Sequence, residues 1–295
     1  MYQAHFGLRE LPFGLTPDTS FAYTCASHQA ALNTLLVAVK NGEGFIKITG
    51  EVGTGKTLLC RTFLSALGTR YASAYIPNPY LEPRTLLLAL AEELRLDVSR
   101  EHQHDQYRLI KGLTRALLSH AAAKRPVVLC LDEAQAMPIE TFEALRLLTN
   151  LETEKRKLLQ VVLFGQPELE ARLAHQSVRQ LRQRITFQYH LEGLRLDELD
   201  SYLDHRMRVA GYQGGRVFSE RAVRVMHRGS RGVPRLVNIL AHKALLVAYG
   251  EGSRQVHAHH LQIALRDTPA ARQRWWRASF HVPRYARVNR LAESR

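Results

Sequence analysis

The strongest constraint on this chain is a glycine-rich segment between two differently patterned stretches. Residues 50–57 read Gly-Glu-Val-Gly-Thr-Gly-Lys-Thr, after the apolar run Phe45 to Thr49 and before a helix-like stretch, Leu58 to Leu67. Gly50 and Gly55 allow consecutive backbone N–H groups to turn inward, which is the arrangement that cradles phosphate oxygens. A strand, this loop and a helix in that order predict a P-loop, and with it an α/β fold.

A P-loop assigns a task to each of its polar residues. Lys56 is expected to reach the β and γ phosphates of ATP, and Thr57 to hold Mg²⁺. The N-terminus of the following helix adds a favourable dipole. The residues predicted to contact the nucleotide are Gly50, Glu51, Val52, Gly53, Thr54, Gly55, Lys56, Thr57 and Leu58.

The rest of the chain divides into three parts. Residues 1–190 alternate apolar runs with helical patterns, which predicts a doubly wound parallel sheet. Residues 191–268 read as helices only, and predict a small helical domain. Residues 269–295 form a basic, aromatic tail with seven arginines and one acid, Glu293. The predicted strands are 45–49, 72–76, 126–131 and 158–164, and the predicted helices of the first part are 27–39 with Ser27 as N-cap, 83–96 and 105–123, after a turn-rich extended segment at 1–23.

Composition limits the cellular setting. No apolar stretch approaches the ~20 residues that a bilayer span requires, and the N-terminus lacks the apolar core of a signal peptide. The three cysteines, Cys25, Cys60 and Cys130, have no paired spacing, which argues against disulfides and zinc. We therefore expect a cytoplasmic protein, held at the inner membrane only if a partner or the tail attaches it. The net charge of +14 favours an acidic partner.

Two acids follow a second buried strand. Asp132 and Glu133 come directly after the run Val127 to Leu131, about 75 residues after the P-loop. Ligands of parallel sheets bind at the carboxyl edge, where such residues emerge. Asp132 is expected to support the Mg²⁺ shell and Glu133 to polarise the water that attacks the γ-phosphate. The pair predicts a hydrolytic site.

Four segments in order give a more specific resemblance. The P-loop, Leu131-Asp132-Glu133-Ala134-Gln135, Phe164-Gly165-Gln166-Pro167-Glu168-Leu169 and Gly232-Val233-Pro234-Arg235 resemble the ExeA/GspA-type AAA+ ATPases. Phe6-Gly7-Leu8, Pro12-Phe13 and Thr16-Pro17-Asp18 also match that group. The resemblance covers about residues 2–268 and is strongest to the ATPases of MSHA-type pilus biogenesis. It implies an AAA+ domain at 1–190 and a helical lid domain at 191–268.

The resemblance implies further site residues. Gln166 corresponds to the sensor 1 residue, which contacts the γ-phosphate or the attacking water, with a turn glutamine as the alternative. Arg235 corresponds to sensor 2 of the lid. Arg184, with Arg182 second and Arg179 in the same segment, is expected to complete the site of a neighbouring subunit, against the alternative of an ordinary surface arginine. Such a finger implies a homo-oligomer, by family analogy a hexamer.

Less specific positions remain open. Asn78 is a candidate to orient Glu133 at rest, or only a turn residue between two prolines. By resemblance, Pro12, Phe13 and His28 are expected to line the adenine pocket. The histidines at 257, 259 and 260 suggest a metal site, but no cysteine or carboxylate spacing accompanies them, so we expect a solvated loop.

Three functions compete. The leading hypothesis is an ATP-hydrolysing motor or switch that serves assembly of a type IV pilus or type II secretion apparatus, with assembly proteins as partners. The family also implies a transmembrane segment and a periplasmic region after the ATPase, whereas this chain continues into the basic tail, which is expected to bind an anionic membrane, DNA or a protein. The alternatives are a DNA-bound regulator like the TnsC and TniB transposition ATPases, and a nucleotide-binding scaffold with negligible turnover.

Overall fold

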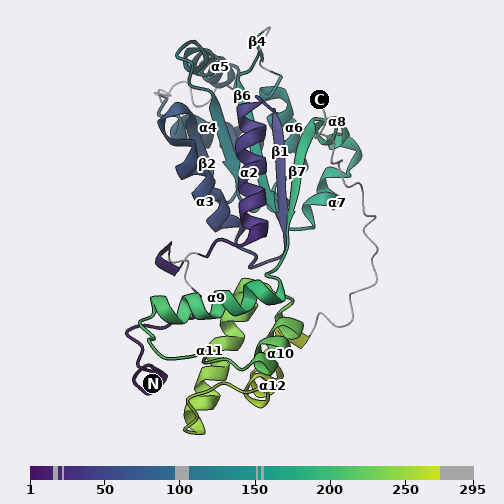
Figure 1. Cartoon of the computed structure of the whole chain (residues 1–295). Coiled ribbons are helices and arrows are strands. Elements are labelled where there is room, and N and C mark those ends of the chain that lie inside the picture. Colours follow the sequence, from purple (N-terminus) through teal and green to yellow (C-terminus); the bar gives the residue numbers. More distant parts are fainter. Residues whose placement is uncertain (16–18, 22, 97–105, 151, 154–155, 273–295) are drawn as a thin grey trace, which may run out of the picture.

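The computed structural model describes residues 1–15, 19–21, 23–96, 106–150, 152–153 and 156–272. Within these ranges a sheet with helices on both faces lies above a smaller group of helices (Figure 1). The predicted turn at 16–18 and most of the basic tail, 273–295, lie outside the described residues. No helix of the described part is long and apolar enough to cross a membrane.

The main sheet has five strands in the order β2-β3-β6-β1-β7, and every neighbouring pair is parallel. This confirms the predicted α/β fold with a parallel sheet. The central strands are buried on both faces, as their nearly continuous apolar sequences indicate. The bounds are β1 Phe45–Gly50, β2 Ala72–Ile76, β3 Val127–Leu131, β6 Leu159–Gly165 and β7 Ile185–Leu191, and a separate antiparallel pair joins β4 Glu152–Thr153 to β5 Arg156–Lys157.

Alternate residues of the strands face two different cores. Ile46, Ile48 and Phe164 pack with helices α2 (Ala26–Lys40) and α3 (Lys56–Leu67). Their neighbours Phe45 and Leu163 pack on the opposite face with the other helices of the body. Those helices are α4 Pro83–Glu93, α5 Gln106–Ala122, α6 Ile139–Leu148, α7 Leu169–Leu173 and α8 Arg179–Arg182. The period-2 geometry of a strand thus explains how one apolar run serves both layers.

A third core belongs to the helices after β7. It contains apolar residues of α9 (Leu196–Val209), α10 (Glu220–Ser230), α11 (Pro234–Gly250) and α12 (Ala258–Arg266). The short α13 (Pro269–Arg272) contacts α10 and α12. Buried residues of the N-terminal segment, including Tyr2, Phe6 and Phe13, join this core rather than the sheet. The buried apolar residues of this segment, which the sequence assigns to the first domain, therefore pack with the helical part.

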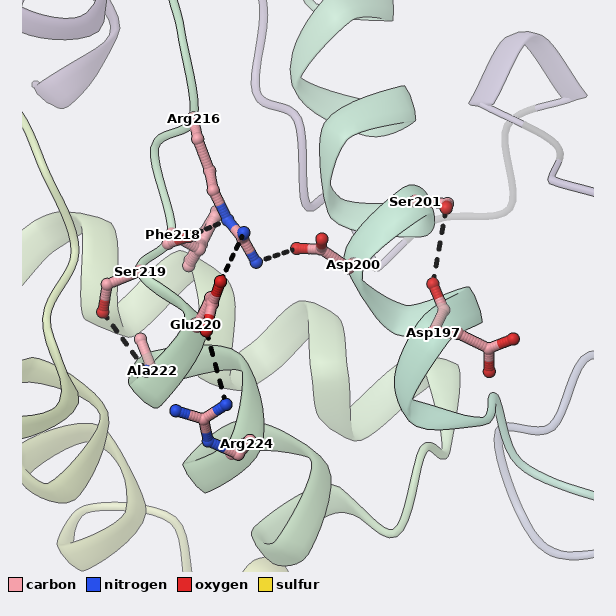
Figure 2. Close-up of polar contacts among 9 residues, drawn as sticks. All are labelled: Asp197, Asp200, Ser201, Arg216, Phe218, Ser219, Glu220, Ala222 and Arg224. Atoms are coloured by element: carbon pink, nitrogen blue, oxygen red, sulfur yellow. Dashed lines mark hydrogen bonds and ion pairs between the residues drawn. The ribbon is translucent and has the colours of Figure 1, made fainter.

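Polar contacts join α9 to α10 across the outer side of this helical part (Figure 2). Arg216 donates to Asp200 of α9 at 2.7 Å and to the carbonyl of Phe218 at 2.8 Å. Glu220 lies 3.8 Å from Arg216 and 3.5 Å from Arg224. Ser219 is the N-cap of α10 and accepts from the Ala222 amide. These exposed ion pairs each contribute at most about 1 kcal/mol, so the apolar core beneath them provides most of the stability.

Two local predictions at the N-terminus were wrong. Residues Tyr2–Phe6 form a helix, α1, where an extended segment was expected, because the buried rings of Tyr2 and Phe6 pack on the helical core. The helix α2 begins after Cys25, which is its N-cap, and not at Ser27. The Ser27 hydroxyl instead accepts a hydrogen bond from the Glu192 amide at 3.1 Å, after β7. The hydroxyl that the sequence pattern predicts as a helix cap therefore makes a long-range contact.

Candidate nucleotide site

The P-loop lies between the end of β1 and the start of α3, as the sequence predicts. Gly53 and Gly55 have φ angles of +83° and +94°, a region that residues with a Cβ rarely adopt. A Cβ at Gly53 would lie 2.4 Å from the Cβ of Arg235, and one at Gly55 would lie 2.7 Å from Nε2 of His28. Glycine is therefore required here by backbone conformation and also by close neighbours from two other segments.

Lys56 is almost completely buried at the base of the loop. Its Nζ donates to the carbonyl oxygens of Gly50 at 2.8 Å and Glu51 at 3.0 Å. Burial lowers the pKa of this ammonium, and the nearby charges of Glu133 and Asp132 oppose that shift. The cation is thus held at the centre of the loop, where an incoming phosphate would take over its hydrogen bonds.

Thr57 and Asp132 come together as the sequence predicts. The Thr57 hydroxyl donates to Asp132 Oδ2 at 2.6 Å, across the contact between α3 and the end of β3. The Tyr75 hydroxyl lies 3.5 Å from the same oxygen, and burial together with the Asp132 charge raises the pKa of Tyr75 to about 12. A hydroxyl and a carboxylate beside a phosphate cradle are the hard oxygen ligands that Mg²⁺ prefers. The residues present fit this ion.

Glu133 and Gln166 are also brought together. Gln166 Nε2 donates to Glu133 Oε2 at 2.9 Å, between the end of β6 and the turn after β3. Gln135 Nε2 donates to the same oxygen at 2.5 Å. Glu133 has a φ of +53°, uncommon for a residue with a Cβ, and its amide donates to Asp132 Oδ1 at 3.0 Å. The tight turn aims the Glu133 carboxylate toward the adjacent strand and its glutamine.

The helical part contacts the P-loop directly. Arg235, the second residue of α11, donates its backbone N–H to the carbonyl oxygen of Gly53 at 3.2 Å. Its side chain is exposed and lines the same pocket as Lys56 and Glu133. The predicted sensor 2 residue is therefore located at the loop, at the N-terminal end of α11.

One pocket is lined by P-loop residues together with Glu133 and Arg235, and it extends toward the N-terminal segment. Pro12 and Phe13, expected to line it, do not: Phe13 packs edge-on against Phe218 in the helical core, and the Pro12 carbonyl accepts from Arg206. Pro12 and Phe13 are buried against the core of the helical part. The N-terminal side of the pocket is formed instead by residues that follow, namely Gly14, Leu15, Phe21, Tyr23, Cys25 and His28.

His28 lines the pocket, as expected from the resemblance. Its Nδ1 lies 2.8 Å from the Sγ of Cys25. Burial lowers the pKa of His28 and raises the pKa of Cys25, so that both groups are favoured in their neutral forms. An uncharged wall suits a nucleobase better than a phosphate.

Asn78 stabilises its own turn in this structure. Its Oδ1 accepts the amide of Tyr80 at 3.2 Å, and the side chain is exposed. The Glu133 carboxylate is bound by Gln135 and Gln166 instead. Asn78 is therefore a turn residue in this structure, because the prolines on either side favour a bend and its short side chain can hydrogen-bond across it.

Arg182 and Arg184 lie away from the pocket of their own chain. Arg182 ends α8 and Arg184 precedes β7, whose far end, Leu191, pairs with Gly50 at the P-loop. At about 3.3 Å per residue, the seven-residue strand separates the two ends by roughly 20 Å. Either arginine can therefore reach a P-loop only if that loop belongs to another subunit.

The three histidines near residue 258 are not a solvated loop, contrary to expectation. His260 is fully buried on α12, and Glu251 Oε2 lies 2.9 Å from Nε2 of both His259 and His260. The ligand atoms of these three residues lie within 4.8 Å of one another, so a carboxylate does accompany the histidines. However, His260 Nδ1 accepts the backbone N–H of His257, which leaves the proton on the Nε2 that faces Glu251. The arrangement is a helix cap with hydrogen bonds to a carboxylate.

Sequence reasoning missed three residues of the site. Gln135 belongs to the segment that follows β3, but the sequence predicts no role for it, since its contact with the Gln166 amide depends on the spacing between β3 and β6. Tyr75 lies on β2 and looks like an ordinary strand residue. Arg206 lines the pocket from α9 while its guanidinium packs 4.7 Å from the ring centroid of Phe21. No local signal identifies a residue that reaches the site only through tertiary packing.

Known proteins provide an independent comparison. A family model described as an AAA domain matches residues 39–173. General secretion pathway protein A of Aeromonas hydrophila is 42% identical over 274 residues, which are 92% of this chain and 49% of that protein. The chain thus spans about half the length of this curated relative.

Solved structures share the fold at low identity. The ORC2 protein of Aeropyrum pernix, solved in ADPNP and ADP complexes, has a TM-score of 0.58 at 16% identity and covers 85% of this chain and 72% of its own. Drosophila ORC bound to DNA has a TM-score of 0.62 at 18% identity, and the match covers 90% of this chain and 65% of that one. The RuvB branch migration motor of Thermotoga maritima has a TM-score of 0.52 at 16% identity, and the match covers 81% of this chain and 68% of that one. Together with the assembled P-loop site, these findings show that the chain belongs to the ExeA/GspA-type family of AAA+ ATPases, which are nucleotide-binding enzymes.

Proposed function

We propose that this chain binds ATP with Mg²⁺ and hydrolyses it at sites completed by neighbouring subunits. The observation that carries the proposal is that two polar pairs meet at one P-loop, Thr57 with Asp132 and Glu133 with Gln166. Thr57 and Asp132 would hold the metal ion, which supplies charge neutralisation for the phosphates. Lys56 would bind the β and γ phosphates, and Glu133 would orient and polarise the attacking water.

Hydrolysis in such a site uses a positive charge from a neighbouring subunit at the γ-phosphate, in addition to Lys56 and Arg235 of the chain's own pocket. Arg184 is the proposed source, from the neighbouring subunit, because it lies at the opposite edge of the sheet from the P-loop of its own chain. Its side chain is half-buried, and that of Arg182 is exposed. We therefore propose a homo-oligomer, hexameric by family analogy, in which nucleotide sites lie between subunits.

A mixing experiment tests this arrangement. Lys56→Ala and Arg184→Ala variants should each have less than about a tenth of the parental ATPase rate, since a lost finger costs at least tenfold. Mixed together, they should recover activity, because a Lys56→Ala subunit still provides Arg184 to the intact P-loop of its neighbour. The same mixture made with Arg179→Ala or Arg182→Ala in place of Arg184→Ala identifies which arginine matters. Mixtures no more active than their separate components would contradict a finger at Arg184.

For the cellular process, we propose assembly or regulation of a type II secretion apparatus or an MSHA-like type IV pilus. The similarity to General secretion pathway protein A supports the first, and the sequence resemblance to pilus ATPases supports the second. The test is affinity capture of the Glu133→Gln variant with ATP present, compared with the same variant without nucleotide. Pilus or secretion proteins enriched by ATP would support the proposal, and their absence beside enriched DNA would favour the alternative below.

The basic tail is proposed to attach the protein to an anionic membrane surface. It contains Trp275 and Trp276 among its arginines, and aromatic residues with positive charge suit a lipid headgroup region. Deleting 273–295, which leaves α13 in place, should lower binding to vesicles that contain anionic lipid by at least about tenfold, since each basic residue near such a surface contributes about 1 kcal/mol. Vesicle co-sedimentation measures this, with neutral vesicles as control. Equal binding by the full and shortened chains would refute the attachment.

A DNA-bound regulator is the second candidate, and a specific observation favours it. The net charge is +14, and α10 exposes three arginines, Arg221, Arg224 and Arg228, on one face. Binding to phosphates through such residues weakens steeply as salt increases. Tight duplex binding at physiological salt, lost on substitution of these arginines, would favour this function over the first.

A further inference from the structure

We propose that Gln135 is a positioning residue for ATP hydrolysis, which holds the Glu133 carboxylate in its working orientation. The inference deepens the proposed function and rests on it. No role for Gln135 follows from its place in the sequence, because its contact with the Gln166 amide joins the turn after β3 to the end of β6.

Both ends of the Gln135 carboxamide are engaged. Nε2 donates to Glu133 Oε2, and Oε1 accepts the backbone N–H of Gln166 at 2.9 Å. The side chain is half-buried on the 3-10 helix Ala134–Ala136. Gly165 permits this approach, since a Cβ there would already lie 3.3 Å from Gln135 Oε1 and 2.8 Å from Leu169. Gln135 therefore connects the catalytic acid to the main chain of the adjacent strand.

Two amides donate to one oxygen of Glu133, but they have different freedom to move. Gln166 contacts Glu133 through its side chain, which must turn away if it is to reach a γ-phosphate as sensor 1. Gln135 is anchored through the backbone of Gln166, and that anchor does not depend on where the Gln166 side chain points. When Gln166 leaves, Gln135 is the donor that remains on Oε2. The position that Gln166 leaves on the carboxylate is then available for a hydrogen bond from a water.

This orientation has a chemical purpose. A carboxylate that polarises water must present a lone pair in one direction, and an unrestrained Glu side chain loses that alignment. Hydrogen bonds to a charged group are about twice as strong as neutral ones, so a single anchored amide is sufficient to restrict rotation. The backbone at Glu133 is already held in an unusual conformation with φ of +53°, which fixes where the side chain starts.

The test uses Gln135→Met, which has a similar length and neither donates nor accepts strongly. We expect kcat to fall at least about tenfold, the effect of one lost charge-assisted hydrogen bond, with KM for ATP within about twofold of the parent. Gln262→Met, at an exposed glutamine of α12, is the matched control and should leave kcat unchanged. A Gln135→Met variant with parental kcat would overturn the proposal.

A second variant tests whether Gln135 acts through its hydrogen bond to Glu133 or only through its contact with Gln166. Gln135→Glu keeps an oxygen that accepts from Gln166 but loses the donor to Glu133 near pH 8, and should be as defective as Gln135→Met. Lowering the pH protonates the introduced carboxyl, whose acidity the neighbouring Glu133 charge weakens, and restores the donor. The rate relative to the parent should therefore rise as pH falls from 8 to 6. Parental activity at pH 8 would mean that only the contact with Gln166 matters.

A measurement without turnover distinguishes this proposal from the proposed function. In ¹⁵N-labelled protein, the side-chain NH₂ signals of Gln135 and Gln166 should both shift in a Glu133→Ala variant. Unchanged Gln135 signals would overturn the contact whatever the ATPase rate. A parent that binds ATP but does not hydrolyse it would contradict the proposed function while these signals still decide whether Gln135 holds Glu133.

Discussion

Replacing Glu133 with glutamine should lower ATP turnover at least about 100-fold and leave ATP binding intact. The two side chains have nearly the same shape, so the P-loop, the Thr57–Asp132 pair and the pocket are preserved. The change removes the carboxylate that polarises the attacking water, and such groups typically account for 10²–10⁴ in rate. Steady-state phosphate release and equilibrium binding of a fluorescent ATP analogue measure the two effects separately.

Lys56→Ala is the matched comparison, because it removes the cation that the loop holds against Gly50 and Glu51. This variant should lose ATP binding and turnover together. A Glu133→Gln protein that hydrolyses ATP at the parental rate would refute the role of Glu133. Parallel loss of binding in both variants would instead indicate that Glu133 supports the pocket and does not act on water.

Replacing Gly53 with alanine should weaken ATP binding about 100-fold. The added Cβ would lie 2.4 Å from the Cβ of Arg235, and the φ of +83° is unfavourable for alanine. Left-handed backbone costs about 1–2 kcal/mol and overpacking about 1–3 kcal/mol, and 1.4 kcal/mol is a tenfold change in affinity. The strain separates α11 from the P-loop or distorts the loop, and either change removes phosphate contacts. Isothermal titration with ATP measures the loss.

Gly68→Ala is the control for backbone strain alone. Gly68 has a φ of +58°, and an added Cβ would meet nothing within 4 Å. Both variants should have a lowered Tm, but only Gly53→Ala should bind ATP poorly. Equal ATP affinities in the two variants would show that the contact between Gly53 and Arg235 has no part in nucleotide binding.

The sequence predicted most of the fold because the signals were local. The strand Ala72–Ile76 has the predicted bounds, and the helix at Pro83 starts where the proline indicates. Failures occurred where distant residues decided the outcome. Tyr2–Phe6 is helical because it packs on the helices after β7, and the Ser27 hydroxyl contacts Glu192 and does not cap α2.

The site shows the same division. Asp132 and Gln166, which directly follow strands, and Lys56, which ends the loop after β1, lie where the sequence predicts, because the carboxyl edge of a parallel sheet gathers them. Pro12 and Phe13 were misplaced, since only the packed core of the helical part decides which part of the N-terminal segment faces the pocket. Glu251 joined His259 and His260 from the end of a different helix.

The sequence by itself determined the P-loop, the parallel sheet and the acids that follow β3, because glycine conformation, apolar periodicity and strand ends act over a few residues. Only the tertiary structure decided which side chains restrain those acids. Gln135 accepts the Gln166 amide because β3 and β6 are neighbours, and Arg235 reaches Gly53 because α11 folds back onto the loop. Hydrogen bonds of this kind depend on positions to within a fraction of an ångström, which packing sets and a sequence pattern does not encode.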